Sequence, residues 1–456
     1  MKSISQSCLT TLSAICIVVS IASCGSARRG MGDHKTAESR SSSSLRSDQD
    51  SLAYLIKDFE LKYQHFCGFM LYDSDAEEVL IKYHEDKHFT PASNLKLFTL
   101  LASLKILGDS IPALAYYEQG DSLLIRGTGD PGFMTKNDVD SVAYHFLRDQ
   151  DQDIYFDDSN FKSERFGSGW AWDDYPYDYQ KELSPMPIYG NGTLITVDSA
   201  SRSYEVYPYQ NILLFKADLF ARRFARREEQ NNWIHINENR LPRYDVVIDI
   251  PSVMEDSFFY DQLSHAVSQP IYQTDSDSVD SLFETIYHTQ GDSLYKDLML
   301  RSDNFVAEQL LLMCSHEQLG HLSTSSVIKH ILQDELSEIT DDIRWADGSG
   351  LSRYSLITPW SAVQVLSELS SILTAEQIAE WFPSDDHDDT LPSQMKGLSI
   401  CAKTGTLSNN FNLSGYITTD SGRRLTFSFL NNHFMYSKAD IASGMAEILS
   451  FIHRHY

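Results

Sequence analysis

The residues that follow Ser93 constrain the fold more than any other part of this chain. From Leu95 to Leu107 the sequence is apolar nearly all round a helical turn. A helix without a polar face has to be buried, because only surrounding elements can keep it out of water. The pattern therefore predicts a helix enclosed by the rest of a domain, with Ser93 held rigidly at its beginning.

Apolar patterns on both sides of this helix predict a mixed fold. The expected elements, in chain order, are a helix from Ser51, a hairpin of strands 67–72 and 79–83, helices over 281–318, strands near 398–403, 413–418 and 425–430, and a final helix over about 438–453. In this order, strands from both ends of the chain can pair in one antiparallel sheet flanked by helices. The fold class is therefore α/β, more closely α+β.

Composition divides the chain into four kinds of segment. Residues 1–23 carry Lys2 before a short apolar run, which is typical of a secretory signal peptide, and residues 24–49 are polar and small, as in a flexible tether. Residues 108–284 contain short β-like runs and many turn residues, so we expect one or more inserted β-rich domains. The main domain then comprises residues 50–107 and 285–456.

The apolar run near the amino terminus closes with Ile21-Ala22-Ser23-Cys24. This order resembles a bacterial lipobox, which implies that a lipidated Cys24 anchors the mature protein to a membrane on the periplasmic or envelope side. An ordinary signal peptide, cut near the same point, is the alternative. The cysteines of the folded part, Cys67, Cys314 and Cys401, give no disulfide framework, and we expect them to be buried thiols.

The formal net charge of −27 excludes nucleic acid as a partner, because a polyanion would be repelled over most of the surface. The basic segment 222–227, which we expect on a helix, does not change this conclusion. The acidic run 385–389 has no second ligand group at metal spacing, so it is typical of a solvated loop. We expect neither a metal nor a cofactor.

Three short motifs carry chemical groups in a fixed order: Ser93-Asn94-Leu95-Lys96, Ser302-Asp303-Asn304 and Lys403-Thr404-Gly405. An alcohol is a poor nucleophile until a base takes its proton, and a lysine three residues further along a helix lies one turn away on the same face. Lys96 can therefore act on Ser93 if burial keeps the amine partly neutral. The backbone N–H groups of Ser93 and Thr406 are the natural donors to an oxyanion.

The second and third motifs supply the remaining groups for acyl transfer. The Ser302 hydroxyl can relay a proton to a leaving amine, and the Asn304 amide can hold the lysine and a substrate. Lys403 adds positive charge, and the hydroxyls of Thr404 and Thr406 can bind a carboxylate. Each group thus has a separate task around one small cleft.

A Ser-x-x-Lys pattern by itself is common, and this chain contains five, beginning at Ser93, Ser159, Ser293, Ser326 and Ser393. Only the first opens a buried helix and precedes both other motifs. Taken alone, Ser302 and Asp303 could cap a helix, and the Lys-Thr-Gly motif could form a turn. Together the three motifs indicate a nucleophilic serine site.

With these motifs the chain resembles the serine penicillin-binding proteins, specifically the low-molecular-mass D-alanyl-D-alanine carboxypeptidase/endopeptidase family. Supporting stretches are PASNLKLFTLLASL, RGTGDPGF, GWAWDDYPY, RSDNFVAEQLL, ADGSGLSRY and AKTGTLSNNFNLSGYI. The resemblance implies a transpeptidase-like domain related to serine β-lactamases. It also implies that Ser93 is acylated, that Lys96 is the base, and that residues 403–406, Gly405 included, clamp a carboxylate. Arg353 and Asp174 are implied as contacts to the peptide stem, although Asp174 could equally be a solvated acid.

The same resemblance implies the substrate and the inhibitors. Peptidoglycan stem peptides ending in D-Ala-D-Ala would acylate the serine, water would release the product, and β-lactams would react at the same residue. Carboxypeptidase and endopeptidase activity need the same groups, so the residues do not separate them. Two alternatives stay open: a β-lactamase or esterase on the same fold, and a catalytically silent wall-binding lipoprotein.

Overall fold

The computed structural model describes residues 42–135, 141–208, 214–274, 282–288, 291–384 and 391–456. Two features predicted from the sequence, the lipidation site at Cys24 and the acidic run 385–389, lie outside the described residues. None of the cysteines within these ranges forms a disulfide. Cys67 and Cys314 are buried free thiols, as expected, whereas Cys401 is only half-buried.

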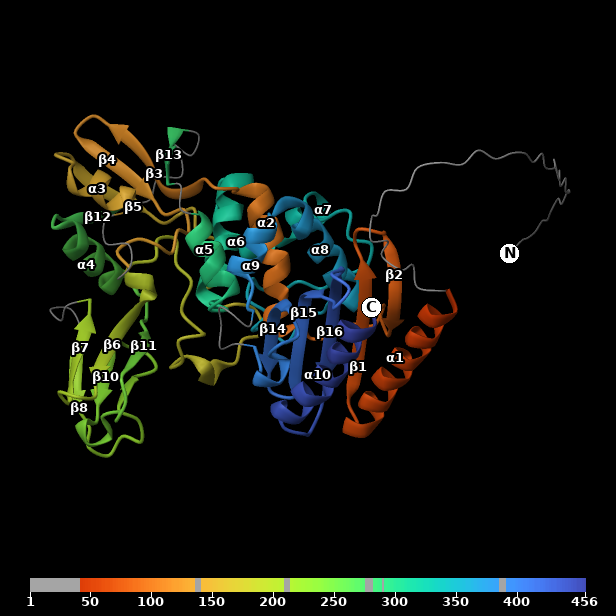
Figure 1. The fold of residues 1–456 in the computed structure, drawn as a ribbon. Helices are drawn as coiled ribbons and strands as arrows, with labels where there is room; N and C mark the ends of the chain where they lie inside the picture. Colours follow the sequence, from red (N-terminus) through yellow and green to blue (C-terminus); the bar gives the residue numbers. More distant parts are fainter. Residues whose placement is uncertain (1–41, 136–140, 209–213, 275–281, 289–290, 385–390) are drawn as a thin grey trace, which may run out of the picture. The chain divides into compact units, whose positions relative to one another are not determined.

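A five-stranded antiparallel sheet combines strands from both ends of the folded chain (Figure 1). Its strands, in the order in which they pair, are β14 (Ile400–Leu407), β15 (Asn410–Thr418), β16 (Arg424–Asn432), β1 (Phe66–Asp73) and β2 (Glu78–Tyr83). Phe69 of β1 lies opposite Phe429 of β16, and every neighbouring pair is antiparallel. The predicted sheet is therefore confirmed.

Helices cover both faces of this sheet. Successive side chains of a strand point to opposite faces, so neighbouring residues of β16 enter different cores. Phe429 packs into a core with α1 (Ser42–Tyr63) and α10 (Lys438–His455). Its neighbour Leu430 packs into a second core with the helices of the other face. Those helices are α2 (Lys96–Ile106), α5 (Gly291–Met299), α6 (Asn304–Leu319), α7 (Thr324–Gln333), α8 (Pro359–Ile372) and α9 (Ala375–Trp381).

The helix that follows Ser93 is enclosed as predicted. A short 3-10 turn, η1 (Ala92–Leu95), leads into α2, in which every residue from Lys96 to Ser103 is buried. The helix ends at Ile106, and Gly108 follows with φ of +57°, a left-handed conformation that favours glycine after a helix. An all-round apolar helix thus sits in the core of the helical face and fixes the turn at its beginning.

The region between α2 and α5 consists mainly of three sheets. A mixed sheet contains β12 (Ile271–Thr274), β5 (Asp153–Asp157), β4 (Ser122–Arg126), β3 (Ile111–Gln119) and β13 (Glu284–His288), in this order. A second sheet contains β11 (Val246–Pro251), β6 (Gly192–Asp198) and β7 (Ser203–Tyr207), in this order. The third contains β8 (Leu214–Ala217), β10 (Trp233–Ile236) and β9 (Ala225–Arg227), also in this order. Two helices, α3 (Val142–Arg148) and α4 (Asp256–Val267), pack on the first sheet. The division of the chain into domains stays a prediction.

Three local expectations were wrong. Helix α1 begins at Ser42 rather than at Ser51, so residues 42–49, which we expected in the flexible tether, are helical. Residues 284–288, expected within a helical stretch, form strand β13, because Thr285 and Ile286 pair with Ala115 and Leu114 of β3. The basic segment 222–227 is not helical either. Its last residues form β9, which pairs with β10 and thereby buries Phe224 in a small core with Ile234 and Ile236.

Candidate active site

The turn between η1 and α2 places Ser93 next to Lys96. Lys96 Nζ lies 3.1 Å from Ser93 Oγ, and the lysine side chain is fully buried while the serine is half-buried. Ala92, directly before the serine, has φ of +49°, which is unusual for a residue with a Cβ atom and is often found at functional sites. The predicted contact of hydroxyl and amine along one helical turn is therefore present.

The surroundings of Lys96 hold its amine and change its protonation. Nζ donates to Asn304 Oδ1 at 2.6 Å and to the Ser349 carbonyl at 2.9 Å. Burial lowers the pKa of Lys96 to about 8, while the carboxylates of Glu308, Asp347 and Asp303 act in the opposite direction. About one lysine in ten is then neutral at pH 7 and about half at pH 8.

The second motif stands at the beginning of α6. Asp303 is the N-cap of the helix, and its carboxylate accepts a hydrogen bond from the Val306 N–H. The interpretation of this motif as a helix cap therefore holds for Asp303. Asn304 follows as the first helical residue, and its Nδ2 donates to the Tyr179 carbonyl at 3.0 Å. Ser302 is half-buried with φ of +55°. Among the described residues no hydrogen bond joins Ser302 to Ser93, so its part in proton transfer stays a prediction.

The third motif lies on β14, directly against the serine turn. Asn94 Nδ2 donates to the Lys403 carbonyl at 2.9 Å and ties the strand to η1. A Cβ atom on Gly405 would lie 2.5 Å from the Pro91 carbonyl oxygen, so only glycine permits this approach. Lys403 is fully buried and its Nζ donates to the Thr404 carbonyl at 3.3 Å.

A cavity of about 610 Å³ opens at this place. Its wall includes Ser93 of the first motif, Asn304 of the second and Thr406, the residue directly after the third, together with Asp174 and Arg353. Lys403, Thr404 and Gly405 themselves do not line it. Asp174 accepts from the Tyr179 hydroxyl at 3.0 Å, and Arg353 donates to the Ser408 carbonyl at 3.3 Å. Segments far apart in the chain therefore meet around one cleft, and both weaker site predictions lie in its wall.

Sequence reasoning missed a pair of buried acids beneath the lysine. Glu308 is fully buried and accepts from the N–H groups of Gly348 and Ser349, each at 2.8 Å. Asp347 accepts from Trp170 Nε1 at 3.0 Å. Burial raises the pKa of both carboxyls. The pair holds the turn in which the Ser349 carbonyl accepts a hydrogen bond from the Lys96 amine.

A signal for Glu308 was present in the sequence, because it is an acid in the mostly apolar run from Phe305 to Met313. A charged residue that is forced into a core requires partners, and here two backbone N–H groups supply them. Asp347 lies in the ADGSG stretch, where the surrounding glycine and serine residues gave no indication of burial.

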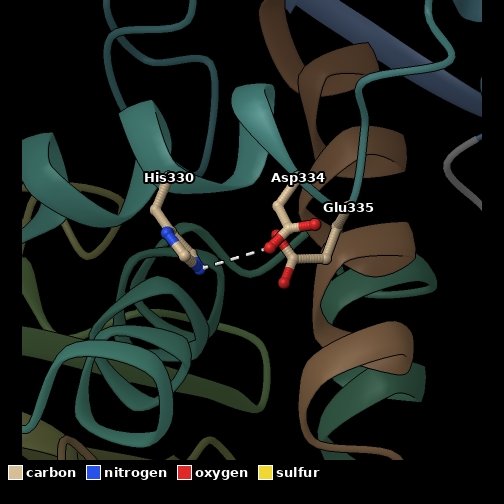
Figure 2. Close-up of side chains that lie close together, drawn as sticks. All are labelled: His330, Asp334 and Glu335. Carbon is tan, nitrogen blue, oxygen red and sulfur yellow. Dashed lines mark ion pairs between the residues drawn. The ribbon is translucent and has the colours of Figure 1, made fainter.

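One group of side chains in the described part of the chain comes close enough to share a metal ion, and it does not line the cleft. Figure 2 shows His330 near the carboxylates of Asp334 and Glu335, with His330 Nε2 4.0 Å from Asp334 Oδ2. Asp334 is exposed, and its spacing from His330 is that of an ordinary ion pair on a helix. We assign no metal to it.

Comparison with known proteins places this fold in a class. The structure resembles the crystal structure of penicillin-binding protein 4 from Haemophilus influenzae, with a TM-score of 0.68 and 19% identity over 88% of this chain and 99% of that chain. The fold is therefore that of a penicillin-binding protein.

The chain belongs to the D-Ala-D-Ala carboxypeptidase 3 (S13) family, whose sequence profile matches residues 48–221 and 292–453. Two relatives agree. D-alanyl-D-alanine carboxypeptidase DacB of Haemophilus influenzae is 23% identical over 82% of this chain and 87% of its own length. D-alanyl-D-alanine carboxypeptidase of an Actinomadura species is 26% identical over 80% of this chain and 77% of its own length.

The predicted resemblance and the predicted serine-type D-alanyl-D-alanine carboxypeptidase are thus confirmed at the level of the family. The roles of individual residues stay predictions.

Proposed function

We propose that this protein removes the terminal D-alanine from peptidoglycan peptides through an acyl-enzyme on Ser93. The observation that carries the proposal is the 3.1 Å contact between Ser93 Oγ and the buried Lys96 amine at the wall of the cleft. Family membership supplies the reaction class, and this contact supports Ser93 as the nucleophile and Lys96 as its base.

The reaction begins with neutral Lys96, which takes the proton of Ser93 as its oxygen attacks the carbonyl of the penultimate D-alanine. The N–H groups of Ser93 and Thr406 stabilise the negative charge that develops on the carbonyl oxygen. The C–N bond then breaks, and the amine of the terminal D-alanine leaves with a proton from Lys96, relayed by Ser302. Water finally adds to the ester, releases the shortened peptide and restores the serine hydroxyl.

Side chains of the cleft wall and of the adjoining strand β14 account for recognition of the peptide. Lys403 and the hydroxyls of Thr404 and Thr406 bind the terminal carboxylate, while Arg353 and Asp174 contact the stem on the other side of the scissile bond. A β-lactam presents a carboxylate and a reactive amide carbonyl, so it acylates Ser93 in the same way. Penicillin-binding protein 4 of Haemophilus influenzae has been solved as a complex with a β-lactam, which supports this expectation.

The test is intact-protein mass spectrometry after treatment with penicillin. We expect one covalent adduct on the natural protein, none on Ser93→Ala, and one on Ser293→Ala, an exposed serine that opens another Ser-x-x-Lys pattern. An adduct on Ser93→Ala would contradict the proposal. An adduct that hydrolyses within seconds would instead indicate the β-lactamase alternative, and the absence of any adduct would indicate the catalytically silent one.

The family places the enzyme in the cell envelope, and we infer that a lipid on Cys24 holds it at a membrane there. The lipobox-like residues 21–24 support this inference. No helix in the described residues is both long and apolar enough to cross a bilayer. Partition between membrane and soluble fractions is the measurement that tests the anchor.

A further inference from the structure

A second cavity, of about 700 Å³, adjoins the segment that lines the catalytic cleft. Four arginines of the basic segment line it, Arg222, Arg223, Arg226 and Arg227, although the chain as a whole carries a net charge of −27. The family profile stops at residue 221 and resumes at 292, so the comparisons assign no role to these arginines.

The arginines of this cavity, which we call the arginine pocket, are not neutralised by direct contact. Within the residues that the structure describes, none of the four lies within 4.0 Å of a carboxylate oxygen in an ion pair. Arg223 and Arg226 donate to the hydroxyls of Tyr177 and Tyr175, at 2.6 and 2.9 Å. Arg227 is buried and donates to backbone carbonyls, that of Pro251 among them.

Acids also line the arginine pocket, but the structure engages two of them elsewhere. Glu228 accepts from Lys216 Nζ at 2.9 Å and lies 2.8 Å from His235 Nε2, while Asp218 faces the other ring nitrogen of His235. Asp173 and Glu229 are exposed at the rim. The guanidinium groups of Arg222, Arg223 and Arg226 therefore remain accessible to an external anion.

The arginine pocket is connected to the catalytic cleft by one short segment, residues 173–179. Asp174 and Tyr179 line the catalytic cleft, whereas Tyr175 and Tyr177 line the arginine pocket. The rings of Tyr177 and Tyr179 stack with centroids 5.1 Å apart, so the two walls are packed against each other. Arg223 lies over the Tyr177 ring, 4.7 Å from its centroid, so the two stacked rings connect Tyr179 in the wall of the cleft with Arg223 in the arginine pocket.

We propose that the arginine pocket binds free carboxylates of an anionic peptide portion of the substrate, at a distance from the bond that is cleaved. This inference rests on the proposed function. Guanidinium groups recognise carboxylates through paired, charge-assisted hydrogen bonds, and several arginines in one concave site favour a ligand with more than one negative charge. The acidic remainder of the surface would direct such a peptide toward the guanidinium groups of this pocket.

The experiment compares two synthetic peptides that end in D-Ala-D-Ala and differ only in remote side chains, which are free carboxylates in one and amides in the other. We expect the natural enzyme to hydrolyse the carboxylated peptide with a several-fold higher kcat/KM, mainly through a lower KM, and added salt to reduce the difference. A triple variant should remove the preference for the carboxylated peptide and leave kcat/KM for the amidated peptide unchanged. It combines Arg222→Gln, Arg223→Gln and Arg226→Gln.

The control removes the same kind of charge outside the arginine pocket. The double variant Arg240→Gln with Arg243→Gln changes two exposed arginines of the same region that do not line the arginine pocket. This variant should keep most of the preference for the carboxylated peptide. Equal penicillin acylation of all variants shows that the catalytic domain is folded. A preference that survives the triple change, or falls equally in the control, would overturn the proposal.

Direct binding separates this inference from the proposed function. The carboxylated peptide is titrated into Ser93→Ala with and without the triple arginine change. Arginine-dependent binding combined with a complete lack of peptide hydrolysis by the natural enzyme would reject the proposed function and retain the arginine pocket. Binding that does not depend on the arginines would reject the pocket, whatever the hydrolysis shows.

Discussion

At the scale of the residue, the central feature is a lysine buried among acids. Full burial disfavours the charged amine of Lys96, while Glu308, Asp347 and Asp303 favour it, and burial prevails. The outcome is a pKa of about 8, at which an amine can both accept a proton from a serine and return it to a leaving group. The same burial that fixes the geometry thus also adjusts the basicity.

This pKa predicts how acylation by penicillin depends on pH. Only neutral Lys96 can take the serine proton, and the neutral fraction rises with pH, so the second-order rate should increase about tenfold per pH unit below pH 8 and level off above it. Stopped-flow measurements between pH 5.5 and 9.5 check the profile.

Substitutions of the lysine provide the control for this prediction. Lys96→Arg keeps a permanent charge, so acylation should fall by about 10²-fold or more at every pH. Lys105→Arg changes a lysine of the same helix that pairs with Glu368, and it should leave the profile unchanged. A flat profile in the natural protein would show that Lys96 is not the base.

At the scale of the element, the site depends on how closely β14 approaches η1. The Asn94 amide bridges to the Lys403 carbonyl, and Asn412 of the next strand donates to the carbonyls of Thr90 and Pro91 at 2.9 and 2.8 Å. The strands therefore hold the serine turn through its backbone, and Thr406 reaches the cleft wall as a consequence.

Gly405→Ala should separate strand and turn. The new methyl group would meet the Pro91 oxygen at 2.5 Å and the Asn94 amide at 2.9 Å, so β14 has to move away. We expect a loss of stability of about 1–3 kcal/mol and a fall in penicillin acylation of about 10²-fold, because displacements near 1 Å misalign the reacting groups. Urea denaturation and acylation kinetics measure the two effects.

A second glycine of a strand serves as the comparison for this change. In β6, a Cβ atom on Gly192 would meet Asp249 Oδ1 at 2.4 Å. Gly192→Ala should therefore reduce stability while acylation stays near the natural rate. Normal acylation by Gly405→Ala would mean that the close contact does not position the site.

At the scale of the whole molecule, the main sheet closes only when both ends of the folded chain are present. β1 pairs with β16, and α1 packs with α10 over the sheet through Leu52, Ile56 and Phe59. Such a side chain contributes about 1.5–3 kcal/mol when it is fully buried. The three together are then comparable with a typical stability of about 5–15 kcal/mol.

Two truncations and one substitution test this arrangement together with the membrane anchor. A protein that begins at residue 42 should be acylated by penicillin at the natural rate and stay in the soluble fraction. One that begins at residue 64 lacks α1 and should aggregate. Cys24→Ala in the full chain should also move to the soluble fraction and keep its acylation rate. Membrane association of Cys24→Ala would contradict the anchor, and folding without α1 would contradict the account of the core.

The sequence by itself determined the buried helix after Ser93, the antiparallel sheet, the three motifs and, through their order, the family. These features depend on local periodicity and on residue types that the chemistry requires. The tertiary structure alone decided that Glu308 and Asp347 meet beneath Lys96, that residues 284–288 pair with β3 as a strand, and that the basic segment lines a pocket beside the cleft. Each of these depends on contacts between residues far apart in the chain. A local pattern can single out an acid in an apolar run, as it does for Glu308, but it does not specify which distant groups that acid contacts.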